Sequence, residues 1–327
     1  MVKALVTGST GFVGSHVVRA LLAAGHEPRA FKRATSVMTA LDDVTGYEPV
    51  VGDVLDPQSL EAAMQGCEWV FHVAAVSDYW RKSVDLLYEV NVQGTRNVLA
   101  AARRAGVKRV VFTSSVAAIG WRKDGFPSDE TVTYNQPPAA FPYAHSKFLA
   151  EIEVLKAVIE GLDCVIVNPA VVIGPGDVYQ EAGSLLIELK RGRLPAIPPG
   201  GVTLIDVRDV AQAHIAAAER GRVAERYILG AVDLSYRAWI TMIADVLGVD
   251  PPRIVLPGIA MPLLGAAVDL ARKLRIPVPA DGNQVRLSGR RLYFDWHKAR
   301  AELGEPQIDI RQSIQDTYDW YLAHGMI

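Results

Sequence analysis

The sequence predicts an α/β protein in which a doubly wound parallel sheet is followed by a smaller mixed α/β domain. Short apolar runs rich in β-branched residues alternate with longer helical patterns through the first half of the chain, which is typical of β-α-β units. After about residue 175 this alternation loosens and prolines become frequent. We therefore expect one domain over residues 1–170 and a second over residues 171–327, with some segments of the second returning to the first.

The apolar runs and helical patterns place the elements of the first domain in order. We expect strands over residues 2–7, 28–31, 48–52, 69–73, 109–113 and 164–168. Helices are expected over residues 12–24, 57–65, 84–105 and 143–160. A glycine, which forms a left-handed C-terminal cap at little cost, follows these helices at Gly25, Gly66, Gly106 and Gly161. Asp56 and Pro57 supply an N-cap and a first-turn proline for the second helix.

Composition excludes several classes of protein. Half of the 327 residues are apolar and 21% are charged, as in an ordinary globular protein of about two domains. The formal net charge of −2 argues against a dedicated nucleic-acid binder or a polybasic membrane binder. Cys67 and Cys164 lie in apolar stretches, so we expect no disulfide framework and a reducing, cytoplasmic location. Because no Cys or His spacing suits a metal site, we expect no metal.

The sequence predicts neither a signal peptide nor a membrane span. The first three residues lead directly into the first strand, without the long apolar region of a signal peptide. Residues 254–268 are uncharged, but they number only 15 and include Pro257 and Pro262. A transmembrane helix needs about 20 apolar residues.

A glycine-rich turn joins the first strand to the first helix. Glycines at three-residue spacing permit a tight turn, close approach of the backbone to a pyrophosphate, and close packing of helix on strand. The amino-terminal end of the helix then faces the phosphates. Together with the strand before it and the helix after it, this turn predicts a dinucleotide site in a Rossmann-type domain. The residues expected to contact the cofactor here are Gly8, Thr10, Gly11, Phe12, Val13 and Gly14.

The end of the second strand bears on the choice of cofactor. An acidic residue there usually holds the 2′-hydroxyl of NAD, whereas a 2′-phosphate requires Arg or Lys. Residues 29–33 contain no acid and end in Lys32 and Arg33. We therefore favour NADP(H), with Arg33 and Lys32 near the phosphate. The alternative is that both are ordinary solvated turn residues.

Tyr143 and Lys147 form the candidate chemical centre. They are four residues apart and so lie on one face of a helix. A tyrosine is a poor acid-base catalyst at neutral pH unless a neighbouring ammonium group favours its phenolate. Ser114 and Ser115 follow the fifth strand, at the edge where open α/β sheets bind ligands, and a serine hydroxyl there could hydrogen-bond the reacting oxygen. Taken alone, the pair could equally be a helix-surface pair.

Together these residues resemble the extended short-chain dehydrogenase/reductase family over most of the chain. The resemblance rests on Tyr143, Lys147 and residues 7–14, 52–56, 72–75, 91–95, 113–115, 168–175 and 206–210. It implies that Asp53 and Val54 lie beside the adenine and that Lys147 binds the nicotinamide ribose. The active hydroxyl of the family lies five residues before the glycine that is Gly120 here, which selects Ser115. The other residues given cofactor contacts on this basis are Ala74, Ala75, Thr113, Tyr143, Pro169 and Val172.

The resemblance also narrows the reaction. Sugar dehydratases of the family carry an Asp-Glu pair directly after the active hydroxyl, whereas Val116 and Ala117 stand here, so dehydration is disfavoured. Two groups remain: the dihydroflavonol 4-reductase-like enzymes, which reduce a ketone with NADPH and share Arg33, and the hopanoid-associated sugar epimerases. Arg33 and Lys32 favour the reductase over an epimerase with bound NAD(P). A non-catalytic NADP(H) sensor is the alternative of another class, but such proteins lose the Tyr143–Lys147 pair.

The sequence is less informative about the substrate and partners. Ser77, Tyr79, Trp80 and Trp121 follow strand ends and are candidates to line a pocket for a flat or apolar small molecule, although core packing is an equal interpretation. We expect the apolar segment 254–276 to cap this pocket; a dimer contact or a membrane surface remains open. The family further implies a homodimer through the helices 84–105 and 143–160.

Overall fold

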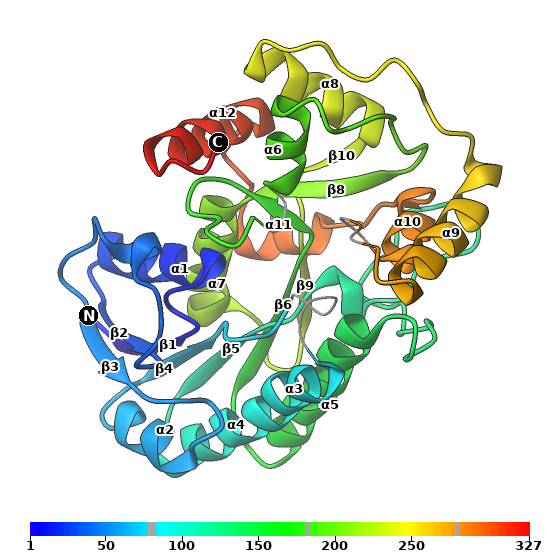
Figure 1. Cartoon of the computed structure of the whole chain (residues 1–327). Helices are drawn as coiled ribbons and strands as arrows, with labels where there is room; N and C mark the ends of the chain where they lie inside the picture. The colour runs from blue at the N-terminus through cyan, green and yellow to red at the C-terminus, as the bar shows by residue number, and fades with distance from the viewer. Residues whose placement is uncertain (78–82, 181–182, 277, 279–280) are drawn as a thin grey trace.

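The computed structural model describes residues 1–77, 83–180, 183–276, 278 and 281–327. They form two sheets, which Figure 1 shows as a larger layered unit carrying the N-terminus and a smaller unit that carries β8 and β10. Tyr79 and Trp80, two of the candidate substrate residues, lie outside the described residues.

The larger sheet has seven strands, and all of its strand pairs are parallel. Their order is β3-β2-β1-β4-β5-β6-β9, so the direction of winding changes between β1 and β4. This confirms the predicted α/β fold with a doubly wound sheet. The strands are β1 (Lys3–Thr7), β2 (Glu27–Lys32), β3 (Glu48–Val51), β4 (Trp69–His72), β5 (Arg109–Thr113), β6 (Cys164–Pro169) and β9 (Arg226–Leu229).

Helices cover both faces of this sheet, so its central strands are apolar on both sides. Alternate residues of one strand enter different cores: Val6 packs with α1 and α7, whereas Leu5 packs with α2 and α4. Figure 1 shows α1 and α7 on one face and α2, α4 and α5 on the other. The helices are α1 (Phe12–Ala23), α2 (Pro57–Met64), α3 (Val84–Tyr88), α4 (Gly94–Arg104), α5 (Pro142–Ile159), α7 (Val207–Arg220) and α11 (His297–Leu303).

Local sequence signals fix where these elements end. The glycines predicted to follow four helices all have positive φ, between 68° and 95°. Asp56 caps α2 by accepting from the backbone N–H of Gln58, with Pro57 in the first turn. The single helix expected over 84–105 differs in one respect: a π-helical turn over Glu89–Gln93 separates α3 from α4. This turn places Asn91 at the centre of contacts described below.

The smaller unit surrounds β8 (Gly201–Asp206), which pairs with β7 (Val171–Ile173), β10 (Val232–Ser235) and β11 (Arg291–Leu292). Its core is formed by residues of β7 and β8 and of three helices, α6 (Ser184–Lys190), α8 (Tyr236–Leu247) and α12 (Ile310–Ala323). Two further helices, α9 (Met261–Lys273) and α10 (Gly282–Ser288), form a hairpin at the side of the molecule (Figure 1). Segments that follow β7 therefore contribute β9, α7 and α11 to the larger unit.

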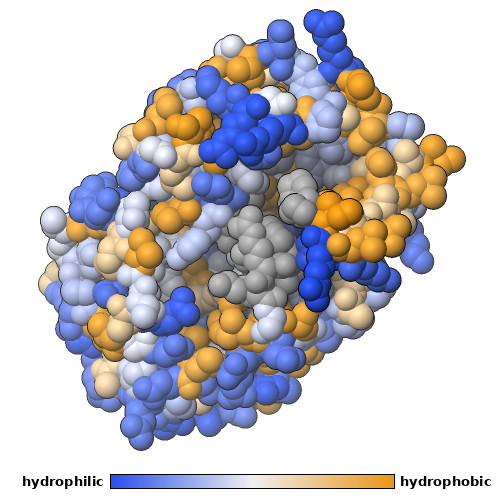
Figure 2. Space-filling model, viewed as in Figure 1, coloured by the Kyte–Doolittle hydropathy of each residue, from blue (hydrophilic) through white to orange (hydrophobic). Residues whose placement is uncertain are grey.

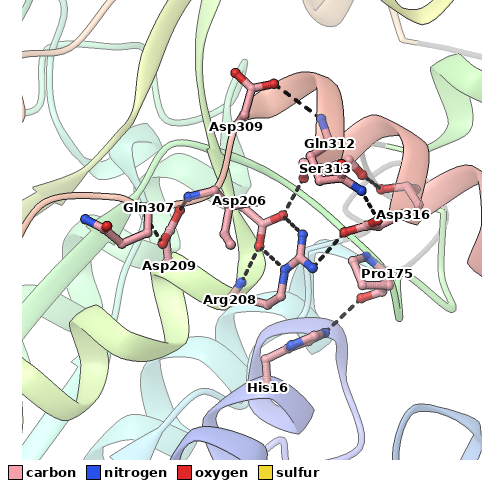
Figure 3. A network of polar contacts seen from close by, with 12 residues as sticks. His16, Pro175, Asp206, Arg208, Asp209, Gln307, Asp309, Gln312, Ser313 and Asp316 are labelled. Atoms are coloured by element: carbon pink, nitrogen blue, oxygen red, sulfur yellow. Dashed lines mark hydrogen bonds and ion pairs between the residues drawn. The ribbon is translucent and has the colours of Figure 1, made fainter. Parts of the chain in front are cut away.

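A polar network joins the two units (Figure 3). Asp206 is fully buried and caps α7 by accepting from the N–H of Arg208 at 2.7 Å. The same carboxylate accepts from the guanidinium of Arg208 and from the hydroxyl of Ser313 in α12 at 2.6 Å. Arg208 also pairs with Asp316 at 2.7 Å. Helix α12 is thus bound to the start of the helix that packs on the larger sheet.

Both cysteines are free and buried. Burial raises the pKa of the Cys164 thiol to about 12 and also raises the pKa of Cys67. Across the residues that the structure describes, no helix is both long and apolar enough to cross a bilayer.

Candidate active site

The glycine-rich turn has no room for side chains at two of its three glycines. Gly8 has φ +67°, and a Cβ there would lie 2.7 Å from the Cα of Ala74. A Cβ on Gly14 would lie 2.1 Å from the carbonyl oxygen of Gly8. The turn therefore packs directly on the segment that follows β4, as a loop that holds a dinucleotide requires.

The amino-terminal end of α1 is open at this turn. Gly11 occupies the N-cap without a side-chain hydrogen bond, and the first turn of the helix carries no acidic residue. Ser9 donates to the carbonyl oxygen of Phe31 at 3.0 Å and holds the turn against the end of β2. Free N–H groups at a helix start suit an anion, so the turn fits the pyrophosphate of a dinucleotide. Phe12 is buried against His16, while Thr10 and Val13 are half-buried.

A chain of hydrogen bonds behind the turn sets the position of Ala74 and Ala75. The N–H of Ala74 donates to the hydroxyl of Thr7, which contacts His72 Nδ1 at 2.8 Å. His72 Nε2 contacts Thr95 at 3.0 Å, and Thr95 donates to the carbonyl oxygen of Asn91. Because Thr95 donates onward, His72 carries its proton on Nε2. Burial lowers the pKa of His72 to about 3, so the ring is neutral.

Asn91 connects the segment after β4 to α5. Its side-chain oxygen accepts from the N–H of Val76 at 2.7 Å, and its nitrogen donates to the carbonyl oxygen of Val76 and to the hydroxyl of Ser146. Ser146 in turn donates to the carbonyl oxygen of Tyr143 at 2.7 Å. The π-helical turn thus ties the candidate cofactor loop to the helix that carries Tyr143 and Lys147.

Lys147 is buried, with 3% of its surface exposed, at the end of β5. Its ammonium group donates to the carbonyl oxygen of Thr113 at 2.6 Å and lies 4.9 Å from the centre of the Phe112 ring. Burial lowers the pKa of Lys147 to about 8, and the carboxylate of Glu151 opposes that shift. The Thr113 hydroxyl faces the other way and contacts His214 at 2.7 Å. Tyr143 is half-buried one helical turn before Lys147.

The two adjacent serines have different surroundings. Ser114 is buried and donates to the carboxylate of Glu151 at 2.5 Å. Ser115 is half-buried, and its hydroxyl oxygen accepts from the N–H of Ala117 at 3.1 Å. A hydroxyl that already accepts a hydrogen bond directs its proton elsewhere. The proton of Ser115 is therefore the one available to an oxygen in the site.

Glu151 is the residue of this site that the sequence interpretation missed. It is buried behind Lys147 and accepts from Asn168 at 2.6 Å and from Arg226 at 3.3 Å as well as from Ser114. Asn168 also donates to the carbonyl oxygen of Ser115. The available signal was its spacing, because Glu151 follows Lys147 by one helical turn on the same face.

The residues expected around the adenosine lie at the ends of β2 and β3. Lys32 ends β2, and Arg33 is exposed, with its backbone N–H donating to the hydroxyl of Ser36 at 3.1 Å. In the part of the chain that the structure describes, no carboxylate pairs with the Lys32 or Arg33 side chain. Asp53 accepts from the N–H of Leu55 at 3.0 Å, and Val54 packs against Gly94. Because neither Lys32 nor Arg33 is paired with a described carboxylate, the side chains of both could contact a phosphate.

Of the candidate substrate residues, Ser77 is half-buried beyond β4. Trp121 contacts the segment that leads to Tyr143. The Trp121 ring meets Phe141 edge-on at 5.9 Å, just before Tyr143, and Arg290 lies over it at 5.0 Å. Asn283 of α10 donates to the carbonyl oxygen of Ala140 at 2.8 Å. The hairpin of α9 and α10 thus adjoins the loop that enters α5. Pro169 and Val172 lie at the end of β6 and in β7.

The chain is similar to known proteins in sequence and in fold. Residues 4–230 match the model of the NAD dependent epimerase/dehydratase family. The chain is 42% identical to the "Putative dihydroflavonol 4-reductase" of Synechocystis sp., over 98% of this chain and 95% of that protein. It is 34% identical to sterol demethylase protein B of Methylococcus capsulatus, over 99% of both. The crystal structure of a nucleoside-diphosphate-sugar epimerase from Pseudomonas aeruginosa has a TM-score of 0.82 at 25% identity, over 100% of this chain and 99% of that one.

The burial of Lys147 predicts a pH dependence of stability. Its pKa of about 8 in the folded protein is below the value of 10.5 expected when it is solvated, so the unfolded chain binds more protons between these values and stability rises with pH. From about pH 7.5 to about pH 9.5, the free energy of unfolding of the wild type should rise by about 2 kcal/mol relative to Lys147→Met. Urea denaturation at both pH values measures this, and parallel curves for the two proteins would contradict it.

Proposed function

The chain belongs to the NAD dependent epimerase/dehydratase family, and from this premise we propose that it reduces a ketone to an alcohol with NADPH. It is an oxidoreductase of the short-chain type, as its relatives are. The observation that carries the proposal is the placement of a buried ammonium group, Lys147, one helical turn from Tyr143 and on the carbonyl oxygen of Thr113, two residues before Ser115 in the chain. The Arg33 and Lys32 side chains support NADP(H) as the cofactor.

The residues present fit such a cofactor. The turn over residues 8–14 excludes side chains at Gly8 and Gly14, and the open start of α1 provides N–H groups for a pyrophosphate. Ala74 borders the turn and Ala75 follows it, and Lys147 would hold the nicotinamide ribose. The bound cofactor supplies the hydride that reduces the carbonyl carbon.

The protein side chains control the oxygen of the substrate. Ser115 donates a hydrogen bond to the ketone oxygen, because its own oxygen is already engaged by Ala117. Tyr143 donates the proton to that oxygen as negative charge develops on it, and the ammonium group of Lys147 stabilises the phenolate that remains. Glu151 orients Ser114 and opposes the loss of the proton from Lys147.

Aromatic residues near Tyr143 and the names of two relatives support a substrate class. Trp121 and Phe141 present aromatic surface beside the entry to α5. The name of the relative with 34% identity contains the word sterol, and the name of the relative with 42% identity contains the word dihydroflavonol. We therefore favour a flat, apolar ketone. The homodimer through the helices over residues 84–105 and 143–160, which are α3, α4 and α5 here, stays a prediction.

Substitution of Tyr143 tests the catalytic assignment. The rate of NADPH oxidation with the best of a panel of steroid, flavonoid and aliphatic ketones should fall by about 10²- to 10⁴-fold in Tyr143→Phe. Tyr88→Phe is the matched control, because the Tyr88 hydroxyl contacts His145 on another side of α5, and it should keep its rate. A Tyr143→Phe protein with the full wild-type rate would show that the assignment is wrong.

The cofactor assignment has its own test. Removal of the cation in Arg33→Ala should weaken NADPH binding by roughly 10- to 100-fold, which is the effect expected for one charge-assisted hydrogen bond. NADH lacks the 2′-phosphate and should bind as it does to the wild type. Titration of cofactor fluorescence measures both affinities, and an equal loss for both would exclude a phosphate contact of Arg33.

A sugar epimerase is the second candidate, favoured by the fold match to a nucleoside-diphosphate-sugar epimerase. An epimerase reuses its cofactor in each turnover, whereas a reductase must release NADP⁺. We expect the purified protein to elute from gel filtration without cofactor and to bind NADPH reversibly. Recovery of one NAD(P) per chain would favour the epimerase instead, and a screen with nucleotide sugars would then follow.

A further inference from the structure

Helix α9 exposes an apolar stripe to solvent. Leu263, Leu270 and Leu274 are 76%, 58% and 64% exposed, and Ile259 in the turn before the helix is 87% exposed. Ala267 continues the stripe, because spacings of four, three and four residues place Leu263, Ala267, Leu270 and Leu274 on one helix face. Figure 2 shows an orange, apolar surface at the right edge of the view, where Figure 1 places α9.

The contacts of α9 with α10 fix this orientation. The inner face carries Gly265 and Asp269, which meet Gly282 and Arg286 of α10. A Cβ on Gly282 would lie 2.4 Å from the carbonyl oxygen of Gly265, and Asp269 pairs with Arg286 at 2.7 Å. A surface helix normally turns its apolar face inward. Here Gly265 and Asp269 face inward beside the buried Met261, and the leucines of the stripe lie on the outer, exposed face.

Cations border the stripe. Lys273 at the end of α9 and Arg275 two residues later are both exposed, and no acidic side chain among the described residues pairs with either of them. An apolar helix face next to unpaired cations is the pattern of a helix that lies in the interface of an anionic bilayer. We propose that α9 docks in this way, with its apolar stripe among the lipid tails and Lys273 and Arg275 at the headgroups.

The area of the stripe favours a bilayer over a second copy of the chain. A helix of 13 residues is about 20 Å long, so one face of it offers on the order of 200 Å², well below the roughly 800 Å² per partner of a stable dimer. The outer face of α9 also offers no carboxylate to a second copy, because Asp269 is engaged by Arg286. A lipid surface requires neither a large area nor an acidic patch on a partner.

The hairpin of α9 and α10 also contacts residues near Tyr143. Asn283 of α10 holds the loop before Tyr143, and Arg290, just beyond α10, covers Trp121. Docking through α9 would therefore bring the loop before Tyr143 close to the lipid surface. An apolar substrate could then enter without crossing water.

Vesicle flotation tests the proposal with the whole protein. The wild type should float with vesicles of phosphatidylcholine and phosphatidylglycerol, and Leu263→Ser/Leu270→Ser should lose at least about tenfold in partitioning. Leu322→Ser is the matched control, because Leu322 is 49% exposed on α12, and it should float as the wild type does. Lys273→Gln/Arg275→Gln should lose roughly fivefold per cation, and only when phosphatidylglycerol is present.

Two results would overturn the proposal. One is equal flotation of the wild type and the leucine double variant. The other is a wild type that does not float but is a dimer in sedimentation, with the double variant a monomer, since the stripe would then bind a second copy. Circular dichroism confirms that each variant is folded. NADPH oxidation with a water-soluble ketone is measured separately, so failure of the proposed reaction and failure of membrane docking are distinguishable.

Discussion

The ammonium group of Lys147 donates to the carbonyl oxygen of Thr113 from a fully enclosed position, and the arrangement of the candidate active site depends on this contact. A charge removed from water costs several kcal/mol unless other groups compensate it. The Phe112 ring and the Glu151 carboxylate are the compensating groups here. Glu151 is itself buried and depends on Ser114, Asn168 and Arg226. One buried cation thus requires α5, β5, β6 and β9 to assemble together.

A second constraint acts on the side of the glycine-rich turn. The contact between Gly8 and Ala74 allows no side chain, and the chain of hydrogen bonds through Thr7 and His72 holds the two segments in register. Asn91 then connects this region to α5 through Ser146. The loop that would hold a dinucleotide and the helix that would perform the chemistry are therefore parts of one polar network. The network is neutral at His72, since burial keeps that ring unprotonated.

The smaller unit depends on a different set of buried charges. Asp206 fixes the start of α7 and the position of α12, and this anchors the second sheet beside the first (Figure 3). The α9–α10 hairpin extends from that unit and reaches back to Ala140 through Asn283. Its inner face is small and charged, while its outer face is apolar. The fold thus combines a sheet whose covering helices are joined by buried polar contacts with an outer helix face that is apolar and exposed.

Much of this protein follows from local sequence. Three signals depend on residues close in the chain: the alternation of apolar runs and helical patterns, the glycines after the helices, and the Asp56 cap. They predicted the α/β fold and six of the seven strands of its larger sheet. They did not predict the seventh strand, β9, or the π-helical turn. The glycine turn and the spacing of Tyr143 and Lys147 likewise located the candidate site. These signals are short-range, because backbone conformation and helix faces depend on neighbouring residues.

Only the tertiary structure decided which side chains meet across long separations. The spacing to Gly120 selected Ser115 over Ser114 only through the family resemblance. The tertiary structure shows how the two serines differ physically, because the buried Glu151 accepts from Ser114 and not from Ser115. Arg226 reaches Glu151 from 75 residues away, which no local pattern indicates. The apolar residues of α9 were visible as a pattern, but the side they face depends on how Gly265 and Asp269 pack against α10. The sequence by itself thus determined the elements and their chemistry, whereas packing decided which groups are buried together and which surface remains exposed.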